Sequence, residues 1–343
     1  MMKPLMLFLG LLVLTACQPA PKEHHQTLLS FGTLVEITFW EDDKAKVDTA
    51  LANIERDLKY MHEAWHAWQP GPLGRTNMLL ETTEEFSANP SVIGLIQKSQ
   101  ALAIRSGHLF NPAVGQLIKL WGYHSDDAPQ GPPPAQSRIK QLLQQNPRMD
   151  DISIKGVRMQ SRNAAVKLDM GAVAKGYALD QLMAMLQGMG IENAIINAGG
   201  DLKAMGRHGD RPWRVGIRHP RDKSGILAGI EVKDGESVFT SGDYERFYEY
   251  EGRRYHHIID PRSGYPAKGT QSVTVIHTEA ATADAAATAL FIAGPSRWQE
   301  IAAAMDIKHV MLVDAQGDIH LTPAMQSRLQ FTEAPKQIHL SEQ

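Results

Sequence analysis

Apolar residues recur along this chain at two different spacings, and the two spacings divide it into helices and strands. Between Val47 and Met61 the apolar residues are three or four positions apart, which is the period of an amphipathic helix. Over residues 28–40 apolar and polar positions alternate instead, which is the period of a strand. Helical patterns predict helices near residues 44–66, 91–106, 137–145, 172–187, 281–293 and 296–305.

Strand patterns are more numerous, and most follow one another without a helix between them. The predicted strands cover residues 28–40, 152–155, 157–160, 165–169, 194–197, 213–217, 227–233, 237–240, 246–250, 254–259, 271–277, 309–313 and 317–321. Consecutive strands of this kind are expected to pair as antiparallel hairpins. The regular strand–helix alternation of a doubly wound sheet is missing. The predicted fold class is therefore α+β, with mostly antiparallel sheets and packed helices.

The beginning of the chain differs from the rest. A short positive start is followed by an apolar run from Leu5 to Leu14, which is typical of a secretory signal and shorter than the ~20 apolar residues that span a bilayer. The run ends in Leu14-Thr15-Ala16-Cys17, which resembles a bacterial lipobox. We expect a lipoprotein signal peptide over residues 1–16 and a lipid on Cys17, which would anchor the protein to a bacterial membrane facing the periplasm. An ordinary signal peptide with a chance cysteine is the alternative.

Composition limits the class of protein. Cys17 is the only cysteine among 343 residues, so the mature chain has no disulfide and no cysteine metal site. The net charge is −3 and there is no run of Lys and Arg, so a nucleic-acid partner is not expected. No second long apolar run follows, so the lipid would be the only membrane attachment. We predict a polar tether over residues 17–27, a single domain over 28–330 whose division into two subdomains stays open, and a C-terminal tail over 331–343.

Five segments of the second half place acids or hydroxyls beside small residues. Such segments let a ligand approach the backbone closely, as a phosphate-bearing ligand and a hard metal ion require. No Walker loop, Gly-x-Gly-x-x-Gly turn or serine nucleophile elbow accompanies them, so the chemistry must be inferred from the set. The segments are residues 168–177, 197–201, 240–244, 256–261 and 283–288.

The first two segments each admit two interpretations. Gly171 permits a close turn from a strand into a helix that starts near Ala172, and free N–H groups at a helix start suit a phosphate. Asp169 is placed either to contact such a ligand or to cap the helix. The pair Gly199 and Gly200 follows an apolar strand, and glycines there would weaken the sheet unless the backbone needs positive φ or must contact a ligand or another backbone; a bulge is the structural alternative.

Asp284 and Thr288 are four positions apart on a predicted helix, so both project from one face. A carboxylate and a hydroxyl together suit Mg²⁺, with metal–oxygen distances near ~2.1 Å. Two ligands are too few, and a backbone carbonyl from another loop must contribute. The structural alternative is that Asp284 only complements the helix dipole and that Thr288 packs.

Two histidine pairs carry further alternatives. His256 and His257 lie near a strand end, where one should face inward and the other outward; a ligand or proton-transfer role for one of them and a structural role are both open. His62-Glu63-Ala64-Trp65-His66 matches the H-E-x-x-H motif of zinc proteases, with Glu63 as base. The third zinc ligand would have to be Glu81, Glu84 or Glu85. A zinc metalloprotease is therefore a remote alternative.

Taken together, these segments resemble the ApbE family of FAD:protein FMN transferases. The resemblance rests on residues 168–180, 197–202, 240–247, 257–264 and 283–290, in family order and spacing, and it extends over roughly residues 28–325. Residues 106–115 are similar to a further family segment that holds the flavin. The family implies a periplasmic or surface lipoprotein that binds FAD and Mg²⁺ and cleaves the FAD pyrophosphate. It transfers FMN to a Thr or Ser hydroxyl of an acceptor protein and releases AMP.

The resemblance also implies roles for individual residues. Asp284 and Thr288 resemble the side-chain metal ligands, and Ala172 and Ala287 would add backbone carbonyls. Asp284 or His257 would accept the proton of the acceptor hydroxyl, and the two are not ranked. The flavin-contacting positions are Phe31, Trp68, Leu109, Phe110, Asn111, Asp169, Lys175 and Ile259. Asn111 stands where many relatives carry Asp.

The implied acceptors are subunits of the sodium-translocating NADH:quinone reductase and of related Rnf-type complexes. Two other functions stay open: an FAD diphosphatase that yields FMN and AMP, and a non-catalytic flavin-binding lipoprotein. In each case we expect a solvent-reached cleft between Gly171 and Thr288. Mg²⁺ bound there would stabilise the charge of the FAD pyrophosphate.

Overall fold

The computed structural model describes residues 22–125, 127 and 129–341. Cys17, the signal peptide and the first part of the tether lie outside these residues, so lipid attachment stays a prediction. Among the described residues, every helix is too short or too polar to cross a bilayer.

All six helices expected from the spacing of apolar residues are present, and their ends agree within two residues. They are α1 (Lys44–Trp65), α3 (Pro90–Arg105), α5 (Gln136–Gln145), α6 (Ala174–Gly188), α7 (Ala280–Ala293) and α8 (Trp298–Met305). Four additional helical segments among the described residues were not predicted. They are α2 (Pro72–Leu80), α4 (Gly115–Leu120), the 3₁₀ turn η1 (Met149–Asp151) and α9 (Pro323–Gln326).

The centre of the molecule is a nine-stranded sheet in the order β1-β2-β6-β7-β10-β13-β14-β15-β17. Neighbouring strands are antiparallel except β15 and β17, which are parallel. The strands are β1 (Lys22–Ser30), β2 (Thr33–Glu41), β6 (Ala194–Ala198), β7 (Asp201–Met205), β10 (Ser237–Gly242), β13 (Thr270–His277), β14 (His309–Asp314), β15 (Ile319–Leu321) and β17 (Ile338–Leu340).

Smaller sheets lie around this one. One has the order β16-β9-β8, a second the order β3-β5-β4, and β11 and β12 form a hairpin. Their strands are β3 (Phe86–Ser87), β4 (Ile152–Lys155), β5 (Arg158–Ser161), β8 (Trp213–Arg218), β9 (Ile226–Val232), β11 (Phe247–Tyr250), β12 (Arg253–His256) and β16 (Leu329–Phe331). The predicted α+β class with mostly antiparallel sheets is confirmed.

Both ends of the described chain contradict the sequence-based prediction. Residues 22–27, assigned to the tether, belong to β1, which pairs with β2 as far as Glu41. The tail predicted over 331–343 contains the end of β16 and all of β17. β1 and β17 are the two edge strands of the large sheet, and their side chains are largely exposed. β1 begins with a polar run, and β17 has only three residues, which are too few to show a strand period.

Two internal strands were also predicted wrongly. Residues 28–40 are not one strand, because Phe31 and Gly32 form a turn between β1 and β2 with φ of 50° and 70°. Residues 165–169 are not a strand, and Lys167 makes only a single bridge to Val114. Alternation in polarity shows which face a side chain occupies, but it does not show whether the backbone finds a partner.

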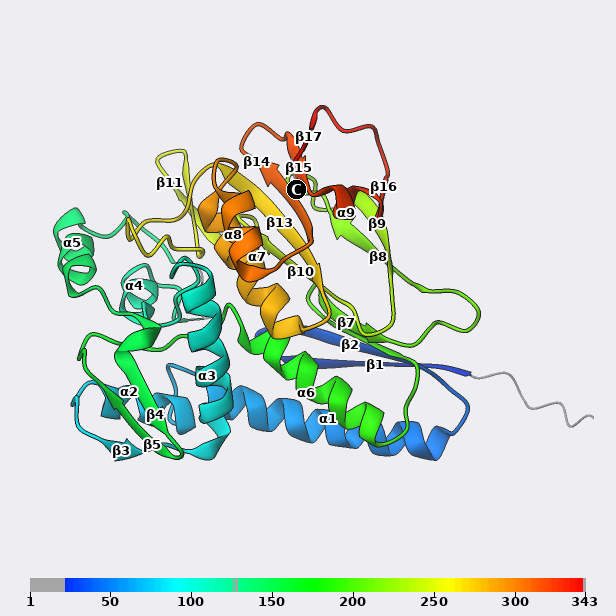
Figure 1. Cartoon of the computed structure of the whole chain (residues 1–343), viewed down its shortest axis with the longest axis horizontal. Helices are drawn as coiled ribbons and strands as arrows, with labels where there is room; N and C mark the ends of the chain where they lie inside the picture. The colour runs from blue at the N-terminus through cyan, green and yellow to red at the C-terminus, as the bar shows by residue number, and fades with distance from the viewer. Residues whose placement is uncertain (1–21, 126, 128, 342–343) are drawn as a thin grey trace, which may run out of the picture.

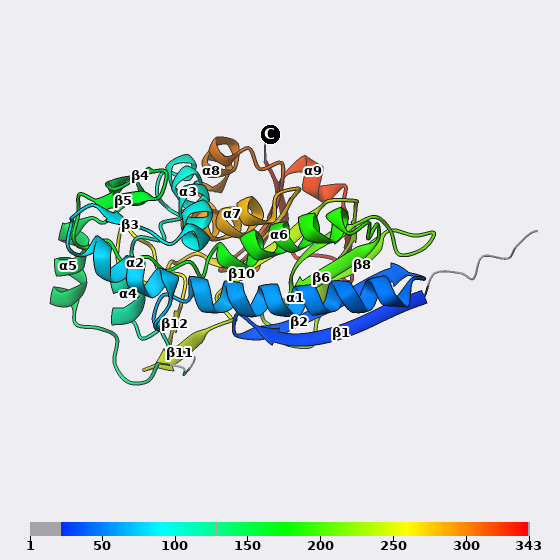
Figure 2. The same cartoon turned by 90° about the horizontal axis from the view of Figure 1, so that it is seen from below.

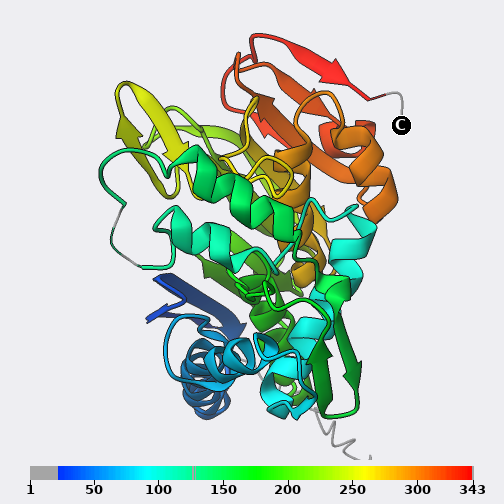
Figure 3. The same ribbon diagram turned by 90° about the vertical axis from the view of Figure 1, so that its left-hand side faces the viewer.

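Helices and the small β16-β9-β8 sheet cover opposite faces of the large sheet. α1 and α6 lie side by side along one face (Figures 1 and 2), where Ile37, Ile196 and Val275 contribute to the main core. On the other face Leu202 and Val238 pack in a second core with Trp213 of β8. A third apolar cluster joins α4 and α5 to the β11–β12 hairpin, drawn in yellow in Figure 3.

Helix α7 is enclosed on all sides between α6, β10 and β13. Of its 14 residues only Thr288 is not buried. The helix is rich in alanine, and it packs so closely on α6 that a Cβ at Gly176 would lie 2.4 Å from the carbonyl oxygen of Ala280. This close approach brings the first turn of α6 against Asp284.

Gly176→Ala is therefore expected to destabilise the protein by about 1–3 kcal/mol, because the methyl group would push α6 and α7 apart. Gly188→Ala is the matched control, since it lies in the same helix and its Cβ would meet nothing within 4 Å. Alanine has the higher helix propensity, so the control should show no loss. Urea unfolding of the two variants measures the difference, and equal stabilities would contradict the close packing.

Candidate active site

Charged side chains from α6, β7 and α7 meet where the two helices approach the large sheet. The Nζ of Lys175, in the first turn of α6, forms a short ion pair with Oδ2 of Asp201. The other oxygen of Asp201 accepts the N–H of Thr240 at 2.9 Å. Burial lowers the pKa of Lys175, but the charges of Asp201 and Asp284 outweigh this and raise it above its usual value. Lys175 is therefore a fixed positive charge in this site.

The paired glycines form the turn that places Asp201. Gly199 and Gly200, with φ of 71° and 106°, are the two residues of a tight hairpin between β6 and β7. Both positions lie in the region of backbone conformation that favours glycine. The expected need for positive φ is therefore confirmed and the bulge interpretation is wrong, because the glycines form the turn that closes the hairpin directly before Asp201.

Asp284 is a carboxylate within the apolar interior, with an exposed fraction of 6%. Its Oδ2 accepts the N–H of Gly176 at 3.0 Å, and its other oxygen accepts no hydrogen bond from the described residues. Burial raises the pKa of Asp284 to about 7, although the charge of Lys175 acts in the opposite direction. Because Asp284 is buried, the expected solvent-reached cleft does not extend to its carboxylate.

In the described part of the chain, the backbone carbonyl of Ala172, just ahead of α6, also accepts no hydrogen bond. In a continuous helix the N–H of Gly176 would bond to the carbonyl of Ala172, but α6 begins at Ala174 and Gly176 donates to Asp284 instead. The carbonyl of Ala172 thus accepts no hydrogen bond from the described residues. It is the carbonyl from another loop that a metal site at Asp284 would require.

These donors fit a hard divalent cation. A carboxylate oxygen of Asp284, the carbonyl of Ala172 and the hydroxyl of Thr288 are the oxygen ligands that Mg²⁺ prefers. The Thr288 hydroxyl lies 3.2 Å from that of Ser241 on β10. Ala287 fits less well, because it lies within α7, where the helix ladder uses its carbonyl. The described residues contain no cluster of three or more His, Cys, Asp or Glu that could hold a metal, so such a site depends on mixed donors.

The start of α6 offers fewer free N–H groups than the sequence suggested. Val173 and Ala174 both donate to the carbonyl of Met170, and Gly176 donates to Asp284. A phosphate at this position would therefore meet mainly the charge of Lys175. Asp169 does not cap the helix, whose N-cap is Val173.

Asp169 contacts one of the predicted flavin residues. Its Oδ2 accepts the indole N–H of Trp68 at 2.8 Å, and its Oδ1 accepts the N–H of Gly171 at 2.9 Å. Phe31, in the turn between β1 and β2, stacks on Trp65 with ring centroids 6.2 Å apart. The structure thus joins Trp68 to Asp169 and places Phe31 at the end of α1, on the helix that leads to Trp68.

Other predicted flavin positions are buried. The side chains of Leu109 and Phe110 belong to the main core, and Ile259 belongs to the third cluster, so only their backbones are placed to contact a ligand. The Asn111 amide donates to the carbonyl of Pro147 at 2.9 Å and accepts the N–H of Ala113 at 3.1 Å. Asn111 also lines a cavity of about 120 Å³.

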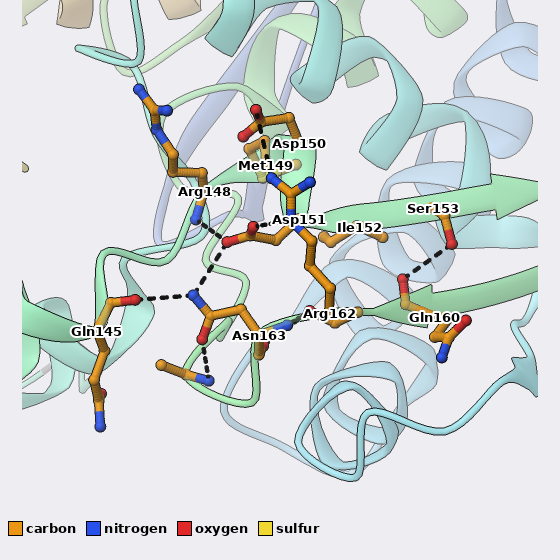
Figure 4. A network of polar contacts seen from close by, with 12 residues as sticks. Gln145, Arg148, Met149, Asp150, Asp151, Ile152, Ser153, Gln160, Arg162 and Asn163 are labelled. Carbon is orange, nitrogen blue, oxygen red and sulfur yellow. Dashed lines mark hydrogen bonds and ion pairs between the residues drawn. The ribbon is translucent and has the colours of Figure 1, made fainter.

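Near this cavity, the buried carboxylate of Asp151 is the centre of a hydrogen-bond network. Figure 4 shows the network. Asp151 accepts the backbone N–H of Arg148 at 3.0 Å, the Nε of Arg162 at 2.7 Å and the amide of Asn163 at 3.1 Å. Asn163 also donates to the carbonyl of Gln145 at 2.9 Å. The network fixes the connection from α5 to β4, and with it the carbonyl that Asn111 contacts.

Of the two adjacent histidines, His256 faces inward and His257 is more exposed, as the alternation of side chains along a strand predicted. His256 is buried and uses both ring nitrogens: Nε2 contacts the carbonyl of Ala267 at 2.9 Å, and Nδ1 accepts the N–H of Ile258 at 3.3 Å. His257 is half-buried, and its Nδ1 donates to the carbonyl of Arg246 at 3.2 Å, which leaves Nε2 as an acceptor. Desolvation lowers the pKa of His257 to about 3, with smaller contributions from the nearby charges of Arg246 and Lys175. His257 is therefore neutral at physiological pH.

The zinc-protease interpretation is wrong. Helix α1 ends at Trp65, so the motif runs past the end of its helix, and His66 has an extended backbone. The rings of these two histidines meet edge to face, 5.7 Å apart. The described residues include no third ligand positioned with them.

Sequence reasoning missed three residues that organise the site. Asp201 was part of a quoted motif but had no assigned partner, and Ser241 was likewise not linked to Thr288. Asp180 accepts the N–H groups of Ala280 and Ala281, both at 2.9 Å, and so anchors the start of α7 on α6. Each of these residues lies 26 to 101 positions away from its partner in the chain, so no local sequence pattern predicts the contact.

Known families and relatives match most of this chain. The model of the ApbE family matches residues 31–311. The chain is similar to an FAD:protein FMN transferase of Rhodobacter capsulatus, with 41% identity over 324 residues, which are 94% of this chain and 61% of that relative. A protein of the same name from Klebsiella pneumoniae (strain 342) is 36% identical over 58% of this chain and 61% of its own length. The matched region thus spans 61% of the length of both relatives.

Solved structures agree in fold. The ApbE protein of Thermotoga maritima has a TM-score of 0.81 and 30% identity, and the match covers 90% of this chain and 99% of that one. The flavin transferase ApbE from Vibrio cholerae has a TM-score of 0.79 and 26% identity, over 90% of this chain and all of that one (100%). The similarity therefore extends over the whole architecture around Asp284.

Asp284→Asn is expected to stabilise the metal-free protein, increasingly so as the pH rises. The native carboxyl keeps its proton up to about pH 7, whereas in the unfolded chain it ionises near pH ~4. The native state therefore binds the extra proton between these values. The wild type loses about 1.4 kcal/mol of stability per pH unit there, and the Asn variant does not.

Thermal unfolding of both proteins in EDTA at several pH values across this window measures the effect. Asp201→Asn is the control of opposite sign, because it removes the carboxylate that pairs with Lys175. A less stable Asp284→Asn variant at neutral pH would show that the protein stabilises the Asp284 anion.

Proposed function

The chain belongs to the ApbE family, and we propose that it is a Mg²⁺-dependent FAD:protein FMN transferase. It would transfer FMN from FAD to a Thr or Ser hydroxyl of an acceptor protein and release AMP. The observation that carries this proposal is the buried carboxylate of Asp284. Within the described residues, one of its oxygens and the carbonyl of Ala172 accept no hydrogen bond, and the charge of Lys175 acts on the carboxylate. Relatives that bear the transferase name are similar over most of this chain.

Asp284, Thr288 and the carbonyl of Ala172 would hold the metal. When bound, Mg²⁺ would supply positive charge that stabilises the negative charge developing on the FAD pyrophosphate. Lys175 supports this assignment, since its ammonium is kept charged and is fixed by Asp201. Asp284 is then committed to the metal and is not the base.

His257 is the residue that would accept the proton of the acceptor hydroxyl. Its Nδ1–H donates to the carbonyl of Arg246, which fixes the tautomer and leaves the lone pair of Nε2 available. Because the imidazole is neutral at physiological pH, the lone pair of Nε2 is unprotonated there and could accept the proton.

The proposal is tested by incubating the purified protein with FAD, Mg²⁺ and an acceptor that bears the target Thr or Ser. Flavin-carrying subunits of sodium-translocating NADH:quinone reductase or Rnf-type complexes are the proposed acceptors. Covalently bound flavin on the acceptor, together with free AMP, is expected, and EDTA should abolish both. Free FMN with no labelled acceptor would indicate an FAD diphosphatase instead, and unchanged FAD would indicate a flavin-binding lipoprotein.

His257→Gln is expected to lower kcat for transfer by about 10²- to 10⁴-fold, the usual contribution of a general base. The affinity for FAD should stay unchanged, because the substitution leaves the metal ligands and Lys175 in place. Single-turnover transfer and equilibrium FAD binding separate the two quantities. Full activity of this variant would remove His257 from the reaction.

A further inference from the structure

The His62–His66 segment has no part in the site described so far, yet His66 makes a specific contact. The residue follows the last turn of α1, and its Nδ1 accepts the backbone N–H of Trp68 at 3.1 Å. A ring nitrogen that accepts the N–H two positions later closes the same small loop as an Asn or Asp side chain in an Asx turn. The residues between α1 and α2 are thereby held in a defined turn.

This turn fixes the residue whose ring contacts Asp169. The backbone of Trp68 is held by His66, and its indole N–H donates to Oδ2 of Asp169 at 2.8 Å. The ring of His124 meets the indole edge to face, with centroids 5.5 Å apart, and the Nζ of Lys167 lies 5.5 Å from its centroid. The indole is therefore held from several sides while Trp68 remains half-buried, so part of it can face a ligand.

We propose that His66 is a positioning residue for the flavin. By fixing the backbone of Trp68, it sets the indole in place as a preformed wall for the isoalloxazine ring before FAD binds. This inference rests on the proposed function, because the ligand is the flavin of the same site. Ordering an aromatic wall in advance removes part of the entropy cost of binding, so His66 contributes to FAD affinity without touching the ligand.

The same histidine turn occurs elsewhere in the described chain and offers a matched control. The Nδ1 of His277 accepts the N–H of Glu279 at 2.9 Å, in the connection from β13 to α7. There the turn is closed in the same way, but the residue it fixes is not aromatic and contacts neither Trp68 nor Asp169. A general effect of opening such a turn should therefore appear in both places, and a flavin effect only at His66.

The experiment compares His66→Leu, His66→Asn and His277→Leu in the full chain. Leucine cannot accept the N–H of Trp68, whereas the side-chain oxygen of asparagine can accept it in an Asx turn. Hydrogen exchange of the Trp68 amide in the flavin-free protein reports the turn directly. Titration of FAD in EDTA, followed by flavin fluorescence, reports affinity without catalysis.

We expect faster exchange of the Trp68 amide in His66→Leu, with about 3- to 10-fold weaker FAD binding, the range expected for loss of one uncharged hydrogen bond. His66→Asn should restore both, and His277→Leu should bind FAD like the wild type. Wild-type affinity in His66→Leu, or equal losses in His66→Leu and His66→Asn, would overturn the positioning role. A wild-type protein that binds no FAD even with Mg²⁺ present would instead refute the proposed function, so the two failures are distinguishable.

Discussion

The main constraint on the structure is that one carboxylate must be accommodated inside an apolar helix. Asp284 is the only charged residue of α7, and every residue of that helix except Thr288 is buried. Burying a charge without compensation is costly, and the surrounding structure supplies the compensation. Gly176 provides an N–H because α6 can approach α7 without a side chain between them, and Lys175 provides a positive charge. Even so the compensation is incomplete, since the pKa of Asp284 remains raised.

The incompletely compensated charge of Asp284 connects the structure to the proposed function. Among the described residues, one oxygen of Asp284 and the carbonyl of Ala172 accept no hydrogen bond. The carbonyl lacks a donor because α6 starts at Ala174 and the N–H of Gly176 bonds to Asp284 instead. A cation that binds only the native state would supply the missing charge and add to stability. A site that costs stability while empty is a common property of functional sites. It is consistent with the proposed Mg²⁺-dependent reaction.

Precise placement of the remaining groups comes from short connections rather than from long elements. The Gly199–Gly200 turn sets Asp201 against Lys175, and the turn closed by His66 sets Trp68 against Asp169. The carbonyl of Arg246 fixes the tautomer of His257. The large sheet and its helices hold these connections together, so that residues from six parts of the chain contribute to one region. The chemistry proposed here therefore depends on the rigidity of several tight turns.

The sequence alone determined the parts that depend on local periodicity. Six of the helices, the α+β class and the alternation of His256 and His257 follow from side-chain spacing, which acts over a few residues. The carboxylate and hydroxyl of Asp284 and Thr288 could be placed on one helical face for the same reason. Pairing was decided only in the tertiary structure: β1 and β17 as edge strands, the hairpin at Gly199 and Gly200, and the ion pair of Lys175 with Asp201. Hydrogen bonds and ion pairs of this kind join atoms that are distant in the chain, and an isolated segment carries no information about its partner.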